Sequence, residues 1–106
     1  MIIGIAKSIA GVKIRLTQER WHHIITSHLE IDPKEYKIVL DVVENPDVIL
    51  RGDSGEPLAA KKQSRKRVWN VVIYKEINKE DAFIVTGYLT SDNNWLFKRE
   101  IIWSKD

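Results

Sequence analysis

Two segments in the second half of the chain constrain the fold more than any other feature. Residues 68–76 and 82–91 are rich in Val, Ile, Tyr, Trp and Thr, and the polar sequence INKED separates them. β-Branched and aromatic residues favour strands, and a polar interval between two such segments is typical of a turn. We therefore expect two strands of a mainly antiparallel sheet here.

Shorter segments add strands before and after this pair. Residues 12–16 alternate apolar and basic, the period of a strand with one buried face. Residues 47–62 contain the turn sequence GDSGE and predict a hairpin. A last strand is expected over 99–103, while the preceding DNNWLFK fits either a strand or a loop.

Two helices are expected between the first strand and the hairpin. Thr17 stands where an N-cap belongs, and apolar residues then recur from Trp21 with helical spacing. Asp32 and Pro33 form a second N-cap and N1 pair, and the following apolar stripe ends before Pro46. The order of elements predicts one α+β domain over 1–106, with helices packed on one face of a mainly antiparallel sheet and with 1–11 as a flexible or added edge segment.

The length and composition of the chain exclude several classes of protein and site. With 106 residues and no cysteine, the chain is of single-domain size and has no thiol for a disulfide or a zinc thiolate site. The opening MIIGIAKSIAG lacks the basic start of an export signal and is too short to span a bilayer. We expect a cytoplasmic protein without a membrane partner.

The net charge of +2 hides an uneven distribution of charges. Positions 61–67 read KKQSRKR, whereas the acids concentrate between residues 30 and 56. Such a run is either a solvated turn or a surface that holds phosphates. Its cations are Lys61, Lys62, Arg65, Lys66 and Arg67.

Three histidines in the first helix are the main concentration of groups that titrate near neutral pH. His28 projects from the same face as Trp21, whereas His23 points to the opposite side and His22 lies between them. The spacings of these histidines do not suit chelation of a metal ion by one helix, so we expect no metal site here. We expect no other cofactor either. His28 is either a proton carrier or a hydrogen-bonded residue of the helix end, and the other two are either functional or solvated.

A row of hydroxyls marks the end of the strand over 82–91. Thr86, Tyr88 and Thr90 project from one face, and Ser91 follows at the tip. Such a row can reflect strand propensity alone. If Arg51, Tyr74 or Lys75 joins that face from neighbouring strands, cations and hydroxyl donors would form a phosphate-binding surface. Exposed aromatic residues on the strands would then stack unpaired bases.

Nearly the whole chain, from Lys13 to Trp103, resembles a nuclease family. The similar strings are RLTQERWHHIITSHLE, VLDVVENPDVILRGDSGEPLAAKK, VWNVVIYKE and AFIVTGYLTS. They resemble the phage and bacterial PBECR domains, the group of barnase, EndoU, colicin E5/D and RelE-like nucleases. The chain departs from the family pattern at Leu29, where the family usually has Pro before Glu.

The resemblance implies two N-terminal helices against a twisted, mainly antiparallel sheet of four or more strands. It also implies a toxin-like, metal-independent ribonuclease whose partners are RNA and, in some branches, an antitoxin. The polar positions that match are Arg20, His23, His28, Arg51, Tyr74, Lys75, Thr86, Tyr88, Thr90 and Ser91.

Metal-free RNA cleavage needs a base, an acid and positive charge, because the RNA 2′-hydroxyl is itself the nucleophile. We expect His28 or His23 to move a proton and Arg51 with Lys75 to stabilise the phosphate. Tyr88, Thr90 and Ser91 would orient it, and the basic run would hold flanking phosphates. Two alternatives stay open: a non-catalytic module that binds RNA or protein, and a metal-dependent hydrolase in which Asp53, Glu56 and His28 converge.

Overall fold

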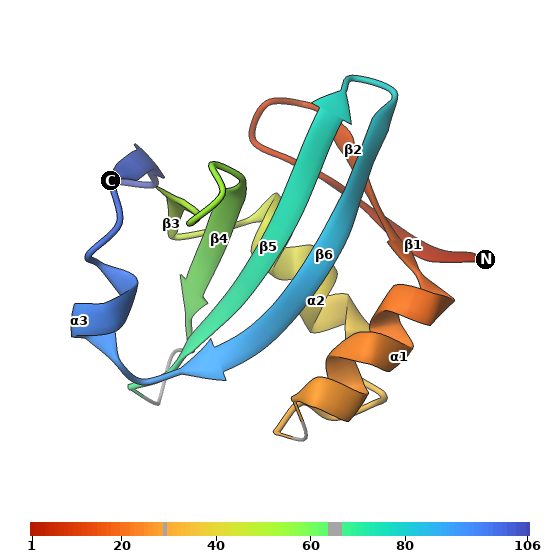
Figure 1. Ribbon diagram of the computed structural model, residues 1–106, viewed down its shortest axis with the longest axis horizontal. Coiled ribbons are helices and arrows are strands. Elements are labelled where there is room, and N and C mark those ends of the chain that lie inside the picture. The colour runs from red at the N-terminus through yellow and green to blue at the C-terminus, as the bar shows by residue number, and fades with distance from the viewer. Residues whose placement is uncertain (29, 64–66) are drawn as a thin grey trace.

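The chain forms one seven-stranded sheet with three short helices (Figure 1). The computed structural model describes residues 1–28, 30–63 and 67–106. The strands are β1 (Ile2–Lys7), β2 (Lys13–Thr17), β3 (Val48–Arg51), β4 (Pro57–Lys62), β5 (Trp69–Asn78), β6 (Asp81–Thr90) and β7 (Ile101–Ser104). Their order across the sheet is β1-β2-β6-β5-β4-β3-β7, and every neighbouring pair is antiparallel except β2 with β6.

The predicted architecture of two N-terminal helices on a sheet of four or more strands is wrong. The described chain is mostly sheet, it begins with the β1–β2 hairpin rather than with helices, and a third helix precedes β7. The sequence left residues 1–11 open between a flexible and an added edge segment, because the apolar residues before Gly11 show no strand alternation. The structure places β1 at one edge of the sheet, and β7, which overlaps the last strand expected over 99–103, at the other.

Helix α1 (Gln18–Ser27) begins where the sequence predicts it. The Thr17 side chain accepts a hydrogen bond from the Arg20 backbone N–H and caps the first turn. Helix α2 (Tyr36–Glu44) starts later than predicted, and its N-cap Glu35 makes no capping side-chain bond. Asp32 instead accepts from the Lys34 N–H and forms a turn before the helix, which removes it as a cap.

Helix α3 (Asn93–Leu96) replaces the strand or loop expected for DNNWLFK. The Asp92 side chain accepts from the Trp95 N–H and caps this single turn. The turn buries Leu96 completely against the sheet.

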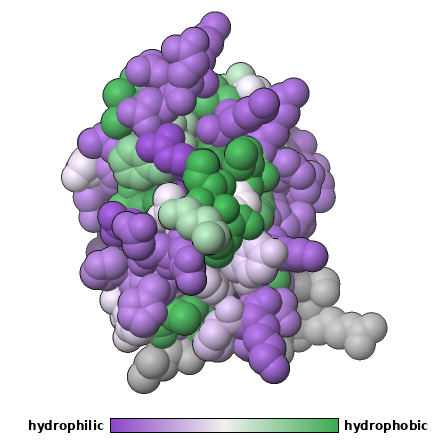
Figure 2. Space-filling model, turned by 90° about the vertical axis from the view of Figure 1, so that its right-hand side faces the viewer, coloured by the Kyte–Doolittle hydropathy of each residue, from purple (hydrophilic) through white to green (hydrophobic). Residues whose placement is uncertain are grey.

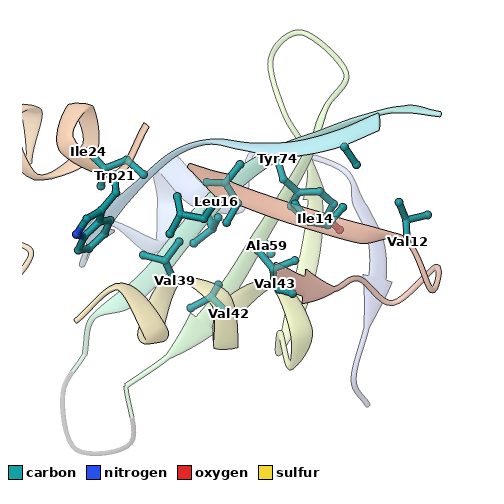
Figure 3. Close-up of a cluster of buried hydrophobic side chains, with 14 of the residues drawn as sticks. Val12, Ile14, Leu16, Trp21, Ile24, Val39, Val42, Val43, Ala59 and Tyr74 are labelled. Carbon is teal, nitrogen blue, oxygen red and sulfur yellow. The ribbon is translucent and has the colours of Figure 1, made fainter. Parts of the chain in front are cut away.

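The sheet has two differently covered faces. Helices α1 and α2 cover one face, where Ile14 and Leu16 of β2 meet Val42 and Val43 of α2 in a closely packed apolar core (Figure 3). Alternate residues of β3 to β5 face the other way and pack beneath Leu96 of α3. We call this second face the open face, because of the described helices only the short α3 and the end of α1 border it.

The side of the molecule that carries β1 is partly apolar. Figure 2 shows a hydrophobic patch there among hydrophilic residues, and Ile2 and Ile5 of β1 are half exposed. The outer edge of β1 has no strand partner within the described residues. None of the described helices is long and apolar enough to cross a membrane.

Candidate functional site

A groove of about 320 Å³ lies on the open face, near the C-terminal end of β6. In Figure 1 that end of β6 lies between α3 and α1. Its lining residues come from α1, from the β3–β4 turn, from three strands and from α3 with the segment after it. They are His28, Asp53, Glu56, Leu58, Ile73, Tyr88, Trp95 and Arg99. We call the hollow lined by these residues the groove. An imidazole, a guanidinium, two carboxylates and a phenol meet there.

His28 enters the groove because α1 ends at this residue. Its backbone N–H still donates a helical hydrogen bond to the Ile24 carbonyl, but its φ of −129° and ψ of 82° leave the helical region, and its ring lies beside Tyr88 of β6. The ring is partly exposed, with 31% of its side-chain surface accessible, and its Nδ1 lies 3.6 Å from the Glu30 carboxylate. The imidazole is therefore reachable from solvent and has a carboxylate near one of its nitrogens.

Three rings follow one another across the groove. The His28 and Tyr88 ring centroids are 5.7 Å apart with the planes tilted by 34°, and Tyr88 meets Trp95 edge to face, also at 5.7 Å. These are ordinary separations for stabilising aromatic pairs. Burial raises the pKa of Tyr88, an effect that the Arg99 charge opposes and the Asp53 charge reinforces. The phenol is thus a neutral hydrogen-bonding group close to both charges.

Arg99 supplies the positive charge. Its guanidinium lies 4.2 Å from the Trp95 ring centroid, and Nη1 donates to the Trp95 carbonyl at 2.8 Å. Only 11% of the side chain is exposed. Nε is buried, and it has no hydrogen-bond partner among the described residues. A buried N–H without a partner is uncommon in folded proteins, which marks this nitrogen as available to a further acceptor.

Two carboxylates complete the groove. Nη2 of Arg99 lies 3.3 Å from one Asp53 oxygen and 3.4 Å from the other, while the Asp53 side chain is 84% exposed. Glu56 is partly buried at the end of the same turn. His28, Asp53 and Glu56 do share the groove, as the metal-dependent alternative requires. Nevertheless, no three His, Asp or Glu side chains in the described part of the chain form a group that could hold a metal ion.

The open face brings together some of the predicted site residues. His28 and Tyr88 line the groove. Thr86 projects from the same face of β6 as Tyr88, opposite Ile73 of β5. Lys75 lies further along β5 in an adjoining hollow, which shares Glu56 and Ile73 with the groove.

Other predicted residues lie elsewhere. Arg51 does not line the groove, and its Nε donates to Glu100 at 2.8 Å. Tyr74 is buried in the core on the helix-covered face, because it alternates with the open-face residues of β5. Arg20 lines a separate hollow beside Arg15, and His23 is exposed on α1.

The tip of β6 is a structural turn rather than part of the groove lining. The Thr90 hydroxyl accepts a hydrogen bond from the Asp92 N–H, which links β6 to α3. Ser91 is exposed at this turn. Neither residue lines the groove.

The basic run divides between the two faces. Lys61 binds Asp41 of α2, with Nζ 2.6 Å from the carboxylate, whereas Lys62 lies over the Trp69 ring at 5.9 Å. Arg67 is exposed. Arg65 and Lys66, also predicted to bind substrate, lie outside the described residues. The described lysines therefore do not form one phosphate-binding stripe.

Sequence reasoning missed Arg99 and Trp95 as site residues. The available signal was Asp92 before two asparagines, an N-cap pattern that predicts a helical turn. Such a turn places Arg99 four residues after Trp95, within reach of its carbonyl. The approach of Asp53, 46 residues earlier, left no local signal.

Comparison with protein-family models, curated proteins and solved structures finds no match to this chain. The resemblance to PBECR nucleases therefore depends on the quoted sequence strings alone. The groove must be interpreted from its own chemistry.

Proposed function

We propose that this chain is a metal-independent endoribonuclease, toxin-like in character, that acts at the groove. One observation carries the proposal: His28 and Arg99 line the same groove, although they lie far apart in the sequence. A proton carrier beside a fixed positive charge is the combination that phosphodiester cleavage needs. The sequence resemblance to PBECR nucleases supports the same reaction.

The reaction divides among three groups of the groove. Glu56 takes the proton of the RNA 2′-hydroxyl as its oxygen bonds to the adjacent phosphorus. His28 gives a proton to the 5′-oxygen as the bond between that oxygen and phosphorus breaks. The products are a 2′,3′-cyclic phosphate and a 5′-hydroxyl end, and the Arg99 guanidinium stabilises the extra negative charge of the phosphorane.

The aromatic rings suit a single-stranded substrate. Tyr88 and Trp95 are only partly buried, so an unpaired base can reach their exposed surface. Lys75 in the adjoining hollow is exposed and supplies charge for a neighbouring phosphate. RNA is therefore the partner that we propose, in the cytoplasm, and an antitoxin covering the groove would silence the enzyme.

The test is cleavage of mixed RNA by the purified protein in EDTA, with analysis of the new ends. We expect 2′,3′-cyclic phosphate ends from the wild type. His28→Gln should lower kcat by about 10²- to 10⁴-fold, and Arg99→Gln by about 10²- to 10³-fold. Matched controls are His22→Gln, an exposed histidine of the same helix, and Arg15→Gln, an arginine paired with Asp81. Thermal unfolding of each variant shows that it is folded.

Three results would contradict the proposal. The first is RNA that stays intact with folded wild-type protein. The second is cleavage that requires a divalent metal. The third is equal activity in the wild type, His28→Gln and Arg99→Gln. Binding of RNA without cleavage would favour the non-catalytic module instead.

A further inference from the structure

The contact between Arg99 and Asp53 is the least expected pairing in the groove. An arginine that is 11% exposed meets an aspartate that is 84% exposed, at 3.3 and 3.4 Å from the same nitrogen. Charge-assisted bonds of this kind are usually 2.7 to 2.9 Å long. The carboxylate is therefore close to the guanidinium but not tightly bound to it.

Arg99 is fixed independently of Asp53. The Trp95 ring and the Trp95 carbonyl hold its guanidinium from one side. The Nη2 nitrogen of the guanidinium then faces the exposed Asp53 side chain, while Nε has no partner among the described residues. If Asp53 left, the guanidinium would stay in place with two of its nitrogens unpaired.

The backbone that carries Asp53 is a closed turn. The Gly52 N–H donates to the Glu56 carbonyl at 2.7 Å, and the Gly55 N–H donates to the Gly52 carbonyl at 2.9 Å. Gly55 has a φ of +89°, which a residue with a side chain rarely adopts. The Asp53 side chain, largely in solvent, can rotate away from Arg99 without any change in this turn.

We propose that Arg99 forms an anion site for a phosphate group and that Asp53 occupies this site in the free protein as an internal competitor. This inference rests on the proposed function only for the identity of the natural anion. A carboxylate and a phosphate both offer oxygen acceptors to a guanidinium. The incoming phosphate displaces Asp53, and its affinity is reduced by the fraction of molecules in which Asp53 is paired.

Titration with inorganic phosphate, followed by NMR of the Arg99 side-chain N–H signals, tests this. We expect phosphate to shift these signals in the wild type, and Asp53→Asn to bind phosphate about two- to fivefold more tightly. Glu80→Gln is the matched control, since it removes the same charge from the exposed β5–β6 turn. It should bind phosphate as the wild type does.

Three outcomes would overturn the inference: unchanged Arg99 signals at saturating phosphate, equal phosphate affinity in Asp53→Asn and Glu80→Gln, or an unchanged pKa of Tyr88 in Asp53→Asn. A second readout follows the Tyr88 phenol by ultraviolet titration against Tyr88→Phe. Because the Asp53 charge helps to raise the pKa of Tyr88, Asp53→Asn should lower it. An unchanged pKa of Tyr88 would show that Asp53 is not at the site.

This titration separates the inference from the proposed function. A protein that binds phosphate at Arg99 but cleaves no RNA retains the anion site and loses the nuclease assignment. A protein that cleaves RNA in the absence of any Asp53 effect retains the nuclease assignment and loses the internal competitor. For an active nuclease, Asp53→Asn should lower KM for RNA by the same factor.

Discussion

Tyr74 and Tyr88 stand on neighbouring strands of one sheet but serve opposite faces. Tyr74 is 2% exposed among the apolar side chains beneath the helices, and its burial, aided by the Glu76 charge, raises its pKa to about 12. Tyr88 is partly exposed between His28 and Trp95, close to a buried cation. The same residue type therefore stabilises the fold on one face and lines a reactive groove on the other.

The difference between the faces follows from what covers them. Two helices cover one face, where Val39, Val42 and Val43 of α2 join the buried apolar cluster that contains the Tyr74 ring. A single turn of helix covers the other face, so His28 and Arg99 can approach from its borders. We expect substitutions on the helix-covered face to change stability and substitutions at the groove to change binding or turnover.

The largest expected effect on stability is in the helix-covered core. Ile14→Ala removes a fully buried side chain and should lower the free energy of unfolding by about 2 to 5 kcal/mol. Thr86→Ala, on the open face, should cost less than about 1 kcal/mol. Urea denaturation of both variants at neutral pH measures the comparison. Equal losses would show that the two faces do not differ in this way.

At alkaline pH we expect the two tyrosines to lower the stability of the protein by different amounts. The pKa of Tyr74 is raised in the folded protein. The contribution of its neutral phenol to the free energy of unfolding is therefore fully present below about pH 10 and is lost as pH rises through about 12. The loss should be about 2 to 3 kcal/mol, and Tyr74→Phe should abolish it. Tyr88→Phe should relieve a smaller loss, since Arg99 opposes the effect of burial there. The measurement is unfolding by urea between pH 7 and pH 12, and the reverse ranking would contradict it.

The smallest effect is expected at acid pH. The hydrogen bond from Lys61 holds the pKa of Asp41 below its usual 3.8. This pair therefore contributes stability above about pH 3.8 that is lost as pH falls through the lower folded pKa. Because the pair is partly exposed, the contribution should be less than about 1 kcal/mol. Asp41→Asn should remove this part of the acid dependence in thermal melts from pH 2 to pH 7, leaving groove activity unchanged.

Local signals predicted the elements with caps and clear periodicity. Thr17 and the apolar spacing after it mark α1, and the alternating segments mark β5 and β6. The prediction failed where a side chain had two local uses, as at Asp32, which closes a turn instead of capping a helix. It also failed for α3, a single turn of helix that gains its stability from the sheet against which it packs.

The sequence predicted part of the groove lining but assigned its positive charge to a different arginine. His28 and Tyr88 were predicted from the face of a helix and the alternation of a strand, and both line the groove. The arginine was assigned to Arg51, which binds Glu100 instead. Choosing between Arg51 and Arg99 requires knowing which face of the sheet each one meets, and that depends on strand order.

Local sequence signals predicted where the first helix starts, that residues 68–76 and 82–91 contain strands, and which side chains of a strand share a face. The parallel pairing of β2 with β6, and the return of the segment after α3 to the turn that carries Asp53, depend on the tertiary structure. Helix caps and side-chain alternation act between residues a few positions apart, so they are readable from the order of residues. The groove joins residues 28, 53 and 99, and such distant contacts form only when the whole sheet buries its apolar surface.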